Sequence, residues 1–369
     1  MKELPMGCDA VQEKVLVAIS GGVDSAVAAA LLVQAGFDVT GVFLCLQTDR
    51  AYGGNDHSCC SSQDAADARS IASKLGIPFR VLSVAEDFAA IIDSFVEDYE
   101  NGRTPNPCIR CNECVKFGRL FELADSLRAR YVATGHYARI TDRGGHPTIA
   151  AARAAGKDQS YVLFRLPRPW LGRILFPVGD LESKQAVRKI ANGLGLEVHD
   201  KPDSQDICFV PDGDYASLLE ARGSRALRSG DIVDSSGRVV GRHDGYGRFT
   251  IGQRRGTGVA MGRPAYVIGI DPENAVVTLG SREELLAGGL TARGANWQVD
   301  VPASFDATVK IRYNHRGAPA RITLTADDTF EVRFHEPIDA VTPGQGAVVY
   351  SDGCLLGGGW IQESLKYGV

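Results

Sequence analysis

The first part of the chain alternates between short runs of consecutive apolar residues and longer segments in which apolar residues recur with a helical period. Such runs are typical of strands buried on both faces, and the helical period is typical of helices that cover them. The predicted strands span residues 15–19, 39–46, 79–84 and 131–134. The predicted helices span residues 26–32, 64–75, 88–100 and 116–129. This order predicts an α/β fold with a doubly wound parallel sheet, whose ligands bind at the carboxyl ends of the strands.

From about residue 224 the pattern changes to short β-rich runs separated by Gly, Asn and Asp. Such runs are typical of small β domains and barrels. They span residues 265–270, 275–279, 307–313, 320–324, 330–334 and 346–350. We therefore predict an α/β domain over residues 1–220, a small central β-rich domain over residues 221–288, and a C-terminal β-barrel over residues 289–369.

The hexapeptide SGGVDS, residues 20–25, lies directly after the first predicted strand and directly before the first predicted helix. Gly21 and Gly22 have no Cβ atoms, so their backbone N–H groups can approach an anion closely. The amino end of the following helix would face the same anion, and the hydroxyl groups of Ser20 and Ser25 add donors. No lysine follows the glycines, so the loop is not a Walker A motif. The loop predicts a phosphate site; a glycine turn without a ligand is the alternative.

The cysteines are the second chemical signal. Nine cysteines in a chain with no signal-peptide pattern argue for thiol chemistry or metal ligation rather than a disulfide framework. Cys111 lies in TPNPCIRCNEC, ahead of a predicted helix whose amino end, with Lys116 or Arg110 as helper, would lower the thiol pKa. Cys208 lies far along the chain in DSQDICF. If the fold brings Cys208 opposite Cys111, one thiol can carry a persulfide while the other expels the product.

Six motifs occur in a fixed order and resemble one enzyme family. They are SGGVDS, GRTPNPCIRCN followed by KF, ATGHYAR, KDQSYVLF, KPDSQDICF and FTIGQRRGTG. SGGVDS by itself is similar to the pyrophosphate loop (PP-loop) of the N-type ATP pyrophosphatases, which adenylate an oxygen atom of a substrate and release pyrophosphate. Together the motifs resemble the bacterial and organellar tRNA-specific 2-thiouridylases, and they cover nearly the whole chain. That family replaces the C2 oxygen of the wobble uridine by sulfur in tRNAs for Lys, Glu and Gln.

The resemblance implies an ATP-dependent tRNA-uridine 2-sulfurtransferase that releases AMP and pyrophosphate. By the resemblance, ATP with Mg²⁺ adenylates O2 of the uridine, and Cys208 carries a persulfide supplied by a cysteine desulfurase or a sulfur-relay protein. Cys111 is then the nucleophilic partner, and a Cys111–Cys208 disulfide remains for a reductant. The first predicted domain would be the PP-loop catalytic domain, and the central domain would bind tRNA.

The resemblance also implies contacts with ATP and tRNA where the local motifs match. The implied ATP contacts are Ala18, Ile19, Ser20, Gly21, Gly22, Val23, Asp24, Ser25, Leu44 and Gly135. The implied contacts with the target base are Asn106, Pro107 and Cys108. The implied tRNA contacts are His136, Lys157, Asp158, Gln159, Arg312, Tyr313 and Gln345. Structural roles are the alternative: His136 as a strand-end histidine bonded to a backbone carbonyl, and Arg312 as a solvated barrel charge.

Two positions depart from part of the family. Many members have aspartate where Cys108 stands, a group proposed to move protons near the base, so the residue with that role is open here. Cys114 extends the segment to Cys-x2-Cys-x2-Cys, a ligand spacing seen in iron–sulfur proteins. Cys108, Cys111 and Cys114, with Cys208 or a sulfur species, are therefore an alternative ligand set for a [4Fe–4S] cluster that delivers sulfur. In that alternative Cys111 is a ligand rather than a free nucleophile.

Composition and charge indicate an ordinary soluble globular protein. The chain has 369 residues, a net charge of −5 at pH 7 and 44% hydrophobic residues. Its amino end has no apolar stretch long enough for a signal peptide or a membrane span. We expect a cytoplasmic protein that has no membrane partner and is monomeric when free of tRNA. Residues 222–255 hold eight arginines against three aspartates, which would either bind tRNA phosphates or form a solvated loop surface.

Two other classes of function stay open. Another adenylating enzyme with a PP-loop, such as a lysidine-type tRNA ligase, would account for SGGVDS but needs no paired cysteines. A non-enzymatic RNA-binding module that retains a nucleotide loop is the second. Full activity on tRNA after replacement of Cys208 would favour the first class, and conversion of ATP to AMP stimulated by tRNA would exclude the second.

Overall fold

The computed structural model describes residues 12–46, 62–201, 207–210, 213–326 and 328–367. Contacts between residues divide the chain into two compact units. The first unit comprises residues 1–90, 108–211 and 352–355, and the second comprises residues 91–107, 212–351 and 356–369. No helix in the described part of the chain is long and apolar enough to cross a membrane.

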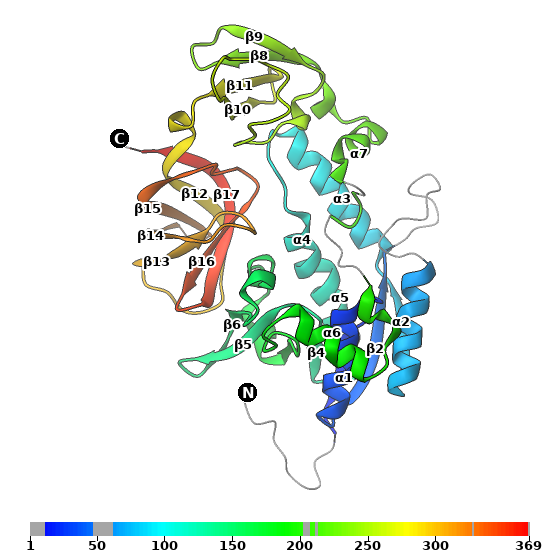
Figure 1. Ribbon diagram of the computed structural model, residues 1–369. Helices are drawn as coiled ribbons and strands as arrows, with labels where there is room; N and C mark the ends of the chain where they lie inside the picture. Colours follow the sequence, from blue (N-terminus) through cyan, green and yellow to red (C-terminus); the bar gives the residue numbers. More distant parts are fainter. Residues whose placement is uncertain (1–11, 47–61, 202–206, 211–212, 327, 368–369) are drawn as a thin grey trace. The chain divides into compact units, whose positions relative to one another are not determined.

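The first unit contains a parallel five-stranded sheet in the order β3-β2-β1-β4-β7. Figure 1 labels β2 and β4 of this sheet. Its strands are β1 (Lys14–Ala18), β2 (Asp38–Cys45), β3 (Phe79–Ser83), β4 (Tyr131–Ala133) and β7 (Ile174–Leu175). β1 lies at the centre, where Val15 pairs with Val39 of β2 on one side and with Tyr131 of β4 on the other. Val15, Leu16 and Val17 are at most 2% exposed, which explains why this strand is a continuous apolar run. The predicted parallel sheet is confirmed.

Helices cover this sheet and bury small side chains. They are α1 (Val23–Gln34), α2 (Ser62–Leu75), α3 (Ala85–Glu100), α5 (Arg119–Ser126) and α6 (Lys184–Gly193), of which α3 begins in the first unit and ends in the second. Residues 26–30 of α1 are at most 1% exposed. Because these side chains are small, α1 lies close to its neighbours α2 and α6. Ser183 caps the amino end of α6, since its Oγ accepts a hydrogen bond from the backbone N–H of Ala186 at 3.2 Å.

The segment with the paired cysteines becomes helical earlier than the sequence pattern predicts. α4 (Pro107–Arg110) leads without a break into a π-helix, η1 (Cys111–Gly118), and then into α5. Pro107 suits the first position of a helix, because its missing N–H would have no partner there. The prolines suggested a loop, so the predicted helix began only at residue 116. Cys111 therefore lies one turn inside the helical segment and not at its amino end.

The second unit contains a four-stranded sheet and a six-stranded barrel. The sheet has the order β10-β11-β8-β9, with β8 (Gly230–Asp234), β9 (Val239–His243), β10 (Tyr266–Asp271) and β11 (Val276–Gly280). The barrel has the order β12-β15-β14-β13-β16-β17 and closes where β17 pairs with β12. Its strands are β12 (Leu286–Trp297), β13 (Ser304–Lys310), β14 (Ala318–Ala326), β15 (Thr329–Asp339), β16 (Gly346–Ser351) and β17 (Cys354–Lys366). Leu290, Ile322, Val332, Val349 and Ile361 are fully buried in its core, as the predicted barrel requires.

Short elements complete the two units. The first unit has an antiparallel hairpin of β5 (Ala138–Arg143) and β6 (His146–Ala151), and the second unit has α7 (Tyr215–Ala221). The short 3₁₀-helices are η2 (Ala155–Lys157), η3 (Ser160–Leu163), η4 (Arg168–Arg173), η5 (Glu197–Asp200), η7 (Arg225–Leu227), η8 (Tyr246–Arg248) and η9 (Glu283–Leu285). The sequence pattern missed β5, β6, β7, β8, β9, β12 and β17. β7 has only two residues, and polar residues or glycines interrupt the apolar pattern of the others. The domain boundaries at residues 220 and 288 stay predictions.

Candidate active site

Adjacent strands bring the predicted ATP-binding residues to one edge of the parallel sheet. Ala18 ends β1, Leu44 lies next to the end of β2, and Gly135 follows β4. Residues 19–25 continue from β1 into α1 at the same edge. The carboxyl ends of the strands are where open α/β sheets bind their ligands. The structure therefore brings these residues together, and their contact with ATP stays a prediction.

Glycine is required at two positions of this edge. Gly21 has a φ of +76°, and a Cβ atom there would lie 2.6 Å from the carbonyl oxygen of Asp64. A Cβ atom on Gly135 would lie 2.6 Å from the backbone nitrogen of Ser25. Gly22 is the N-cap of α1, and no side chain caps this helix. No capping side chain therefore competes with an anion for the N–H groups of the first turn.

The two serines of the PP-loop contact each other. The backbone N–H of Ser20 donates a hydrogen bond to Oγ of Ser25 at 3.1 Å, and the two hydroxyl oxygens are 3.2 Å apart. The hydroxyl of Ser25, a residue only 6% exposed, donates to the carbonyl oxygen of Gly22 at 3.0 Å. Oγ of Ser25 thus occupies the acceptor position at the Ser20 N–H that a phosphate oxygen could take.

Asp24 of the PP-loop is held by two side chains from distant parts of the chain. The hydroxyl of Tyr137 donates to Oδ1 of Asp24 at 2.7 Å, and Nζ of Lys184 donates to Oδ2 at 2.7 Å. The Lys184 side chain is only 11% exposed, so its charge needs a partner. Sequence reasoning included Asp24 but missed Lys184 and Tyr137. The motif ATGHYAR contains Tyr137 and was the available signal.

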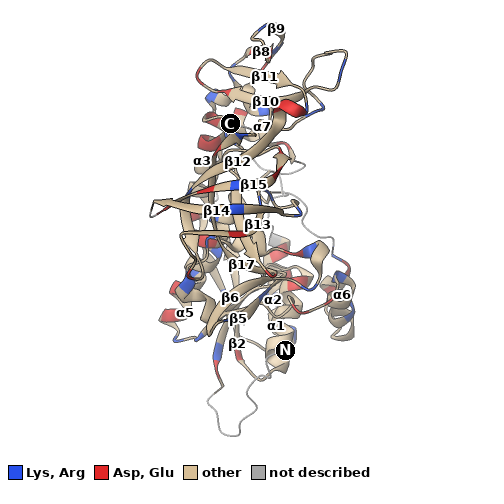
Figure 2. Cartoon of the chain, turned by 90° about the vertical axis from the view of Figure 1, so that its left-hand side faces the viewer, with Lys and Arg blue, Asp and Glu red and all other residues tan. Residues whose placement is uncertain are grey.

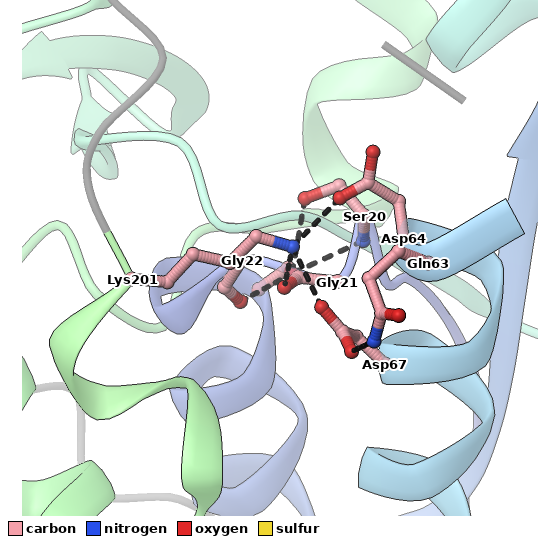
Figure 3. Close-up of polar contacts among 8 residues, drawn as sticks. Ser20, Gly21, Gly22, Gln63, Asp64, Asp67 and Lys201 are labelled. Carbon is pink, nitrogen blue, oxygen red and sulfur yellow. Dashed lines mark hydrogen bonds and ion pairs between the residues drawn. The ribbon is translucent and has the colours of Figure 1, made fainter. Parts of the chain in front are cut away.

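Lys201 reaches the PP-loop from the end of η5 (Figure 3). Its ammonium donates hydrogen bonds to Oδ1 of Asp64 and Oδ2 of Asp67, both at 2.7 Å, and to the carbonyl oxygen of Gly21 at 3.2 Å. Burial opposes the charge of Lys201, but the hydrogen bonds to both aspartates raise its pKa. Sequence reasoning missed Lys201, although it begins the motif KPDSQDICF, of which residues 202–206 lie outside the described residues.

Cys108, Cys111 and Cys208 form one group of free thiols that affect one another electrostatically. Burial raises the pKa of Cys111 to about 12; Lys116 lowers this pKa, and charges on Cys208, Cys108 and Cys114 raise it. Desolvation also raises the pKa of Cys108, an exposed residue, and Lys116 and Cys208 act on it in the same directions. The predicted lowering of the Cys111 pKa is therefore wrong. Burial outweighs Lys116, and Cys111 does not lie at the amino end of the helical segment.

The charged groups that act on Cys114 differ from those that act on Cys108 and Cys111. Desolvation and the charge of Glu113 raise the pKa of Cys114, while Arg165 and Arg110 lower it. Glu113 and Arg165 form an ion pair at 2.9 Å. Within the described ranges, no three His, Cys, Asp or Glu side chains form a group that could hold a metal ion. The alternative in which Cys108, Cys111 and Cys114, with Cys208 or a sulfur species, hold a [4Fe–4S] cluster stays a prediction.

His136 is a half-buried side chain next to the cysteine segment. Its ring stacks on Phe117 of η1 with 5.9 Å between ring centres, and its Nδ1 lies 2.8 Å from the hydroxyl of Thr134. Burial, and then the charge of Lys116, lower the pKa of His136 to about 3. His136 is therefore neutral near pH 7. Its contact with tRNA stays a prediction.

The residues of the motif KDQS support loops of the first unit. Oε1 of Gln159 accepts a hydrogen bond from the backbone N–H of Tyr137 at 2.9 Å. Oδ2 of Asp158 accepts one from the hydroxyl of Ser160 at 2.9 Å. Lys157 ends η2. Asp158 and Gln159 thus have structural bonds, and the tRNA contacts of all three motif residues stay predictions.

The other predicted tRNA contacts lie in the second unit. Arg312 and Tyr313 follow β13, where the guanidinium of Arg312 lies 3.8 Å from the carboxylate of Asp339 and Tyr313 is 39% exposed. The side-chain amide of Gln345 donates a hydrogen bond to the carbonyl oxygen of Thr104. This carbonyl lies two residues before the first predicted contact with the target base.

Several arginines of residues 222–255 have acidic partners within the second unit. Arg222 pairs with Asp93, and Arg238 pairs with Asp234 at 3.1 Å. Lys and Arg are interspersed with Asp and Glu along the chain (Figure 2). Arg254 lines an open pocket together with Thr257 and residues 259–265. The local surplus of arginine is thus partly neutralised by intramolecular pairs.

Three family models match the chain. The model described as the tRNA methyl transferase HUP domain matches residues 13–212. The tRNA methyl transferase PRC-barrel domain matches residues 218–281, and the aminomethyltransferase beta-barrel domain matches residues 287–361. The first two ranges contain the parallel sheet and the four-stranded sheet, and the third covers most of the barrel.

Curated relatives are similar along nearly the whole chain. The tRNA-specific 2-thiouridylase MnmA of Geobacter metallireducens is 45% identical over 365 residues, which cover 97% of this chain and 99% of the relative. The protein of the same name from Geotalea uraniireducens is 45% identical and covers 96% of each chain. That of Solibacter usitatus is 46% identical and covers 95% of this chain and all of its own.

Proposed function

The chain belongs to the family of tRNA-specific 2-thiouridylases, and from this membership we propose that it replaces O2 of the wobble uridine by sulfur in tRNAs for Lys, Glu and Gln. The reaction consumes ATP. The observation that carries the proposed mechanism is the electrostatic coupling of Cys208 to Cys111 in the same unit as the PP-loop. Cys208 and Cys111 lie far apart in the sequence, and the effect of Cys208 on the pKa of Cys111 supports a shared sulfur-transfer cycle.

Adenylation of the uridine is the first step. O2 attacks the α-phosphorus of ATP while N3 of the uridine loses its proton to water. The bond from that phosphorus to the bridging oxygen breaks, and pyrophosphate leaves. The uncapped amino end of α1 supports binding of the phosphates at the PP-loop. Mg²⁺ in nucleotide sites is commonly held by the phosphates with one or two carboxylates. Any Mg²⁺ at this site would be carried mainly by the phosphates of ATP.

Sulfur transfer is the second step. A cysteine desulfurase or a relay protein supplies a persulfide to Cys208. Its terminal sulfur attacks C2, the C2–O2 bond breaks, and AMP leaves with the oxygen. Cys111 then attacks the sulfur of Cys208, the S–S bond to the uridine sulfur breaks, and 2-thiouridine is released with the Cys111 proton returned to N3. The Cys111–Cys208 disulfide is reduced by an external thiol before the next cycle.

The protonated, uncharged state of the Cys111 thiol supports this order of steps. A thiol with a pKa near 12 is a weak nucleophile at neutral pH, because the thiolate is the reactive form. Cys111 therefore stays protonated in the free protein. It would become reactive only when the adduct on Cys208 supplies a proton acceptor at N3. We further propose a cytoplasmic enzyme that is monomeric when free of tRNA.

A single-turnover reaction tests the proposal. The full chain is mixed with ATP, an unmodified tRNA-Glu transcript, and a cysteine desulfurase with cysteine. We expect 2-thiouridine at the wobble position by nucleoside mass spectrometry, with one AMP and one pyrophosphate formed for each thiouridine. A transcript with cytidine at that position is the matched control and should stay unmodified. AMP formation without thiouridine would contradict thiolation, and full activity of Cys208→Ser would contradict the role of Cys208.

A further inference from the structure

The PP-loop lacks the lysine that a Walker A loop carries beside its glycines, yet a lysine ammonium lies against it. Lys201 contributes this ammonium from 180 positions along the chain (Figure 3). We propose that Lys201 is a pyrophosphate-binding residue of the ATP site, a role that rests on the proposed function and adds a phosphate ligand to it. The fold thus brings to the loop a lysine that the loop's own sequence does not contain.

The three hydrogen bonds of Lys201 differ in kind. Two are short, charge-assisted bonds to the carboxylates of Asp64 and Asp67 at 2.7 Å. The third is a longer bond of 3.2 Å to the neutral carbonyl of Gly21. An ammonium has three N–H donors, so it can keep both carboxylates and exchange the carbonyl for a phosphate oxygen. The exchange is favourable, because a charged acceptor binds an ammonium more strongly than a neutral one.

The surroundings of Lys201 hold its ammonium at the loop. The backbone of Asp64 packs directly on Gly21, where a Cβ atom would lie 2.6 Å from its oxygen. Arg188 of α6 donates to the carbonyl oxygen of Lys201 at 3.1 Å and fixes the backbone there. The Lys201 side chain is 32% exposed, so a ligand can reach it. Lys184 is 11% exposed and bonds to Asp24, which makes it the less accessible of the two lysines.

Binding measurements on the full-length protein test the role of Lys201. Inorganic pyrophosphate, ATP and AMP are titrated into the wild type, Lys201→Met and Lys201→Arg by calorimetry. Lys74→Met is the matched control, because Lys74 of α2 donates to the carbonyl oxygen of Gly195 and so also joins α2 to the segment before Lys201. Thermal unfolding of each variant without ligand checks that it folds.

We expect Lys201→Met to weaken pyrophosphate and ATP binding by about tenfold to a hundredfold, the range for one charge-assisted hydrogen bond. AMP, which lacks the two phosphates that leave, should bind as it does to the wild type. Lys201→Arg should keep most of the affinity, and Lys74→Met all of it. Unchanged pyrophosphate binding in Lys201→Met, or an equal loss for AMP and ATP, would overturn the proposal. A wild type that binds neither ATP nor pyrophosphate would instead contradict the proposed activation step.

Discussion

The side-chain amide of Gln345 donates a hydrogen bond to the backbone carbonyl of Thr104 at 2.9 Å. The backbone continues this contact, because the N–H of Thr104 donates to the carbonyl oxygen of Pro343 at 2.9 Å. A Cβ atom on Gly344 would lie 3.0 Å from the Thr104 oxygen, so the two segments pack closely. Gln345 thus holds the residues that lead directly to Asn106, the first predicted contact with the target base.

Gln345→Leu should therefore lower kcat of tRNA thiolation more than it changes KM for tRNA. The loss should be about fivefold, which corresponds to about 1 kcal/mol for one hydrogen bond. Gln362→Leu is the matched control, because Gln362 also donates to a backbone carbonyl, that of Trp360. Steady-state kinetics with varied tRNA measure both constants. A raised KM at unchanged kcat would show instead that Gln345 binds tRNA directly.

Cys111→Ser and Cys208→Ser should fail at different stages. Cys208→Ser has no sulfur to carry and should form no covalent link to tRNA. Cys111→Ser can still transfer the persulfide sulfur to C2 but cannot expel the product. It should therefore accumulate a Cys208–tRNA adduct that dithiothreitol cleaves. A denaturing gel without reductant measures the adduct, and its appearance with Cys208→Ser would contradict the assigned roles.

Alkylation of Cys111 should be slow at neutral pH and should accelerate as the pH rises. Burial raises its pKa to about 12, so below that pH the thiolate fraction grows about tenfold for each pH unit. Lys116→Met should slow the labelling of Cys111 at a given pH, because Lys116 lowers this pKa. Iodoacetamide labelling of the free protein at pH 7, 8 and 9, followed by peptide mass spectrometry, gives the rates. A labelling rate of Cys111 that is already constant above pH 7 would contradict the raised pKa.

His136 should make the protein less stable in mild acid. Its folded-state pKa is lowered to about 3 and the unfolded value is about 6.5, so between these limits the unfolded chain binds the extra proton. The free energy of unfolding should therefore fall by up to about 1.4 kcal/mol for each pH unit below 6.5. Urea unfolding at pH 7.5 and pH 5 measures the change. His136→Asn should show a smaller decrease than the wild type, and equal decreases would refute the assignment.

Cys114→Ser should keep full thiolation activity. Cys114 lies beside the Glu113–Arg165 pair, and its charge is the last of the causes that raise the pKa of Cys111, after Cys208 and Cys108. The protein is prepared anaerobically, and the iron and acid-labile sulfide in the wild type and variant are measured beside their activities. Loss of both bound iron and activity in Cys114→Ser would favour the cluster alternative.

Local sequence patterns predicted a strand or helix well wherever the residues of that element alone show its hydrophobic pattern. The buried run of β1 and the small residues of α1 identified the strand, loop and helix of the PP-loop, because each pattern lies within a few consecutive residues. β12, by contrast, has LAGGLTARGANW, in which glycines and alanines weaken the alternation. Its pairing with β15 and β17 compensates for that weak local preference, and no local pattern reports such partners.

The sequence motifs proposed which cysteines act together, which stays a prediction, but they did not indicate the pKa shifts of those cysteines. Cys111 and Cys208 could be paired from motifs, yet the sign of the Cys111 pKa shift depends on burial that only the packed structure creates. Lys184 and Lys201 were missed for a related reason. A lysine that approaches a loop from a distant segment has the same local sequence context as a lysine on the surface.

The PP-loop and the two lysines that contact it lie far apart along the chain, so they are translated at different times. Asp24 and Lys184 are 160 positions apart, and Gly21 and Lys201 are 180 positions apart. The loop leaves the ribosome early in synthesis, whereas both ammonium groups follow only after most of the first unit has been translated. A nascent chain that stops before residue 184 therefore carries SGGVDS without either cation. The proposed phosphate site is therefore completed only after residue 201 has been translated.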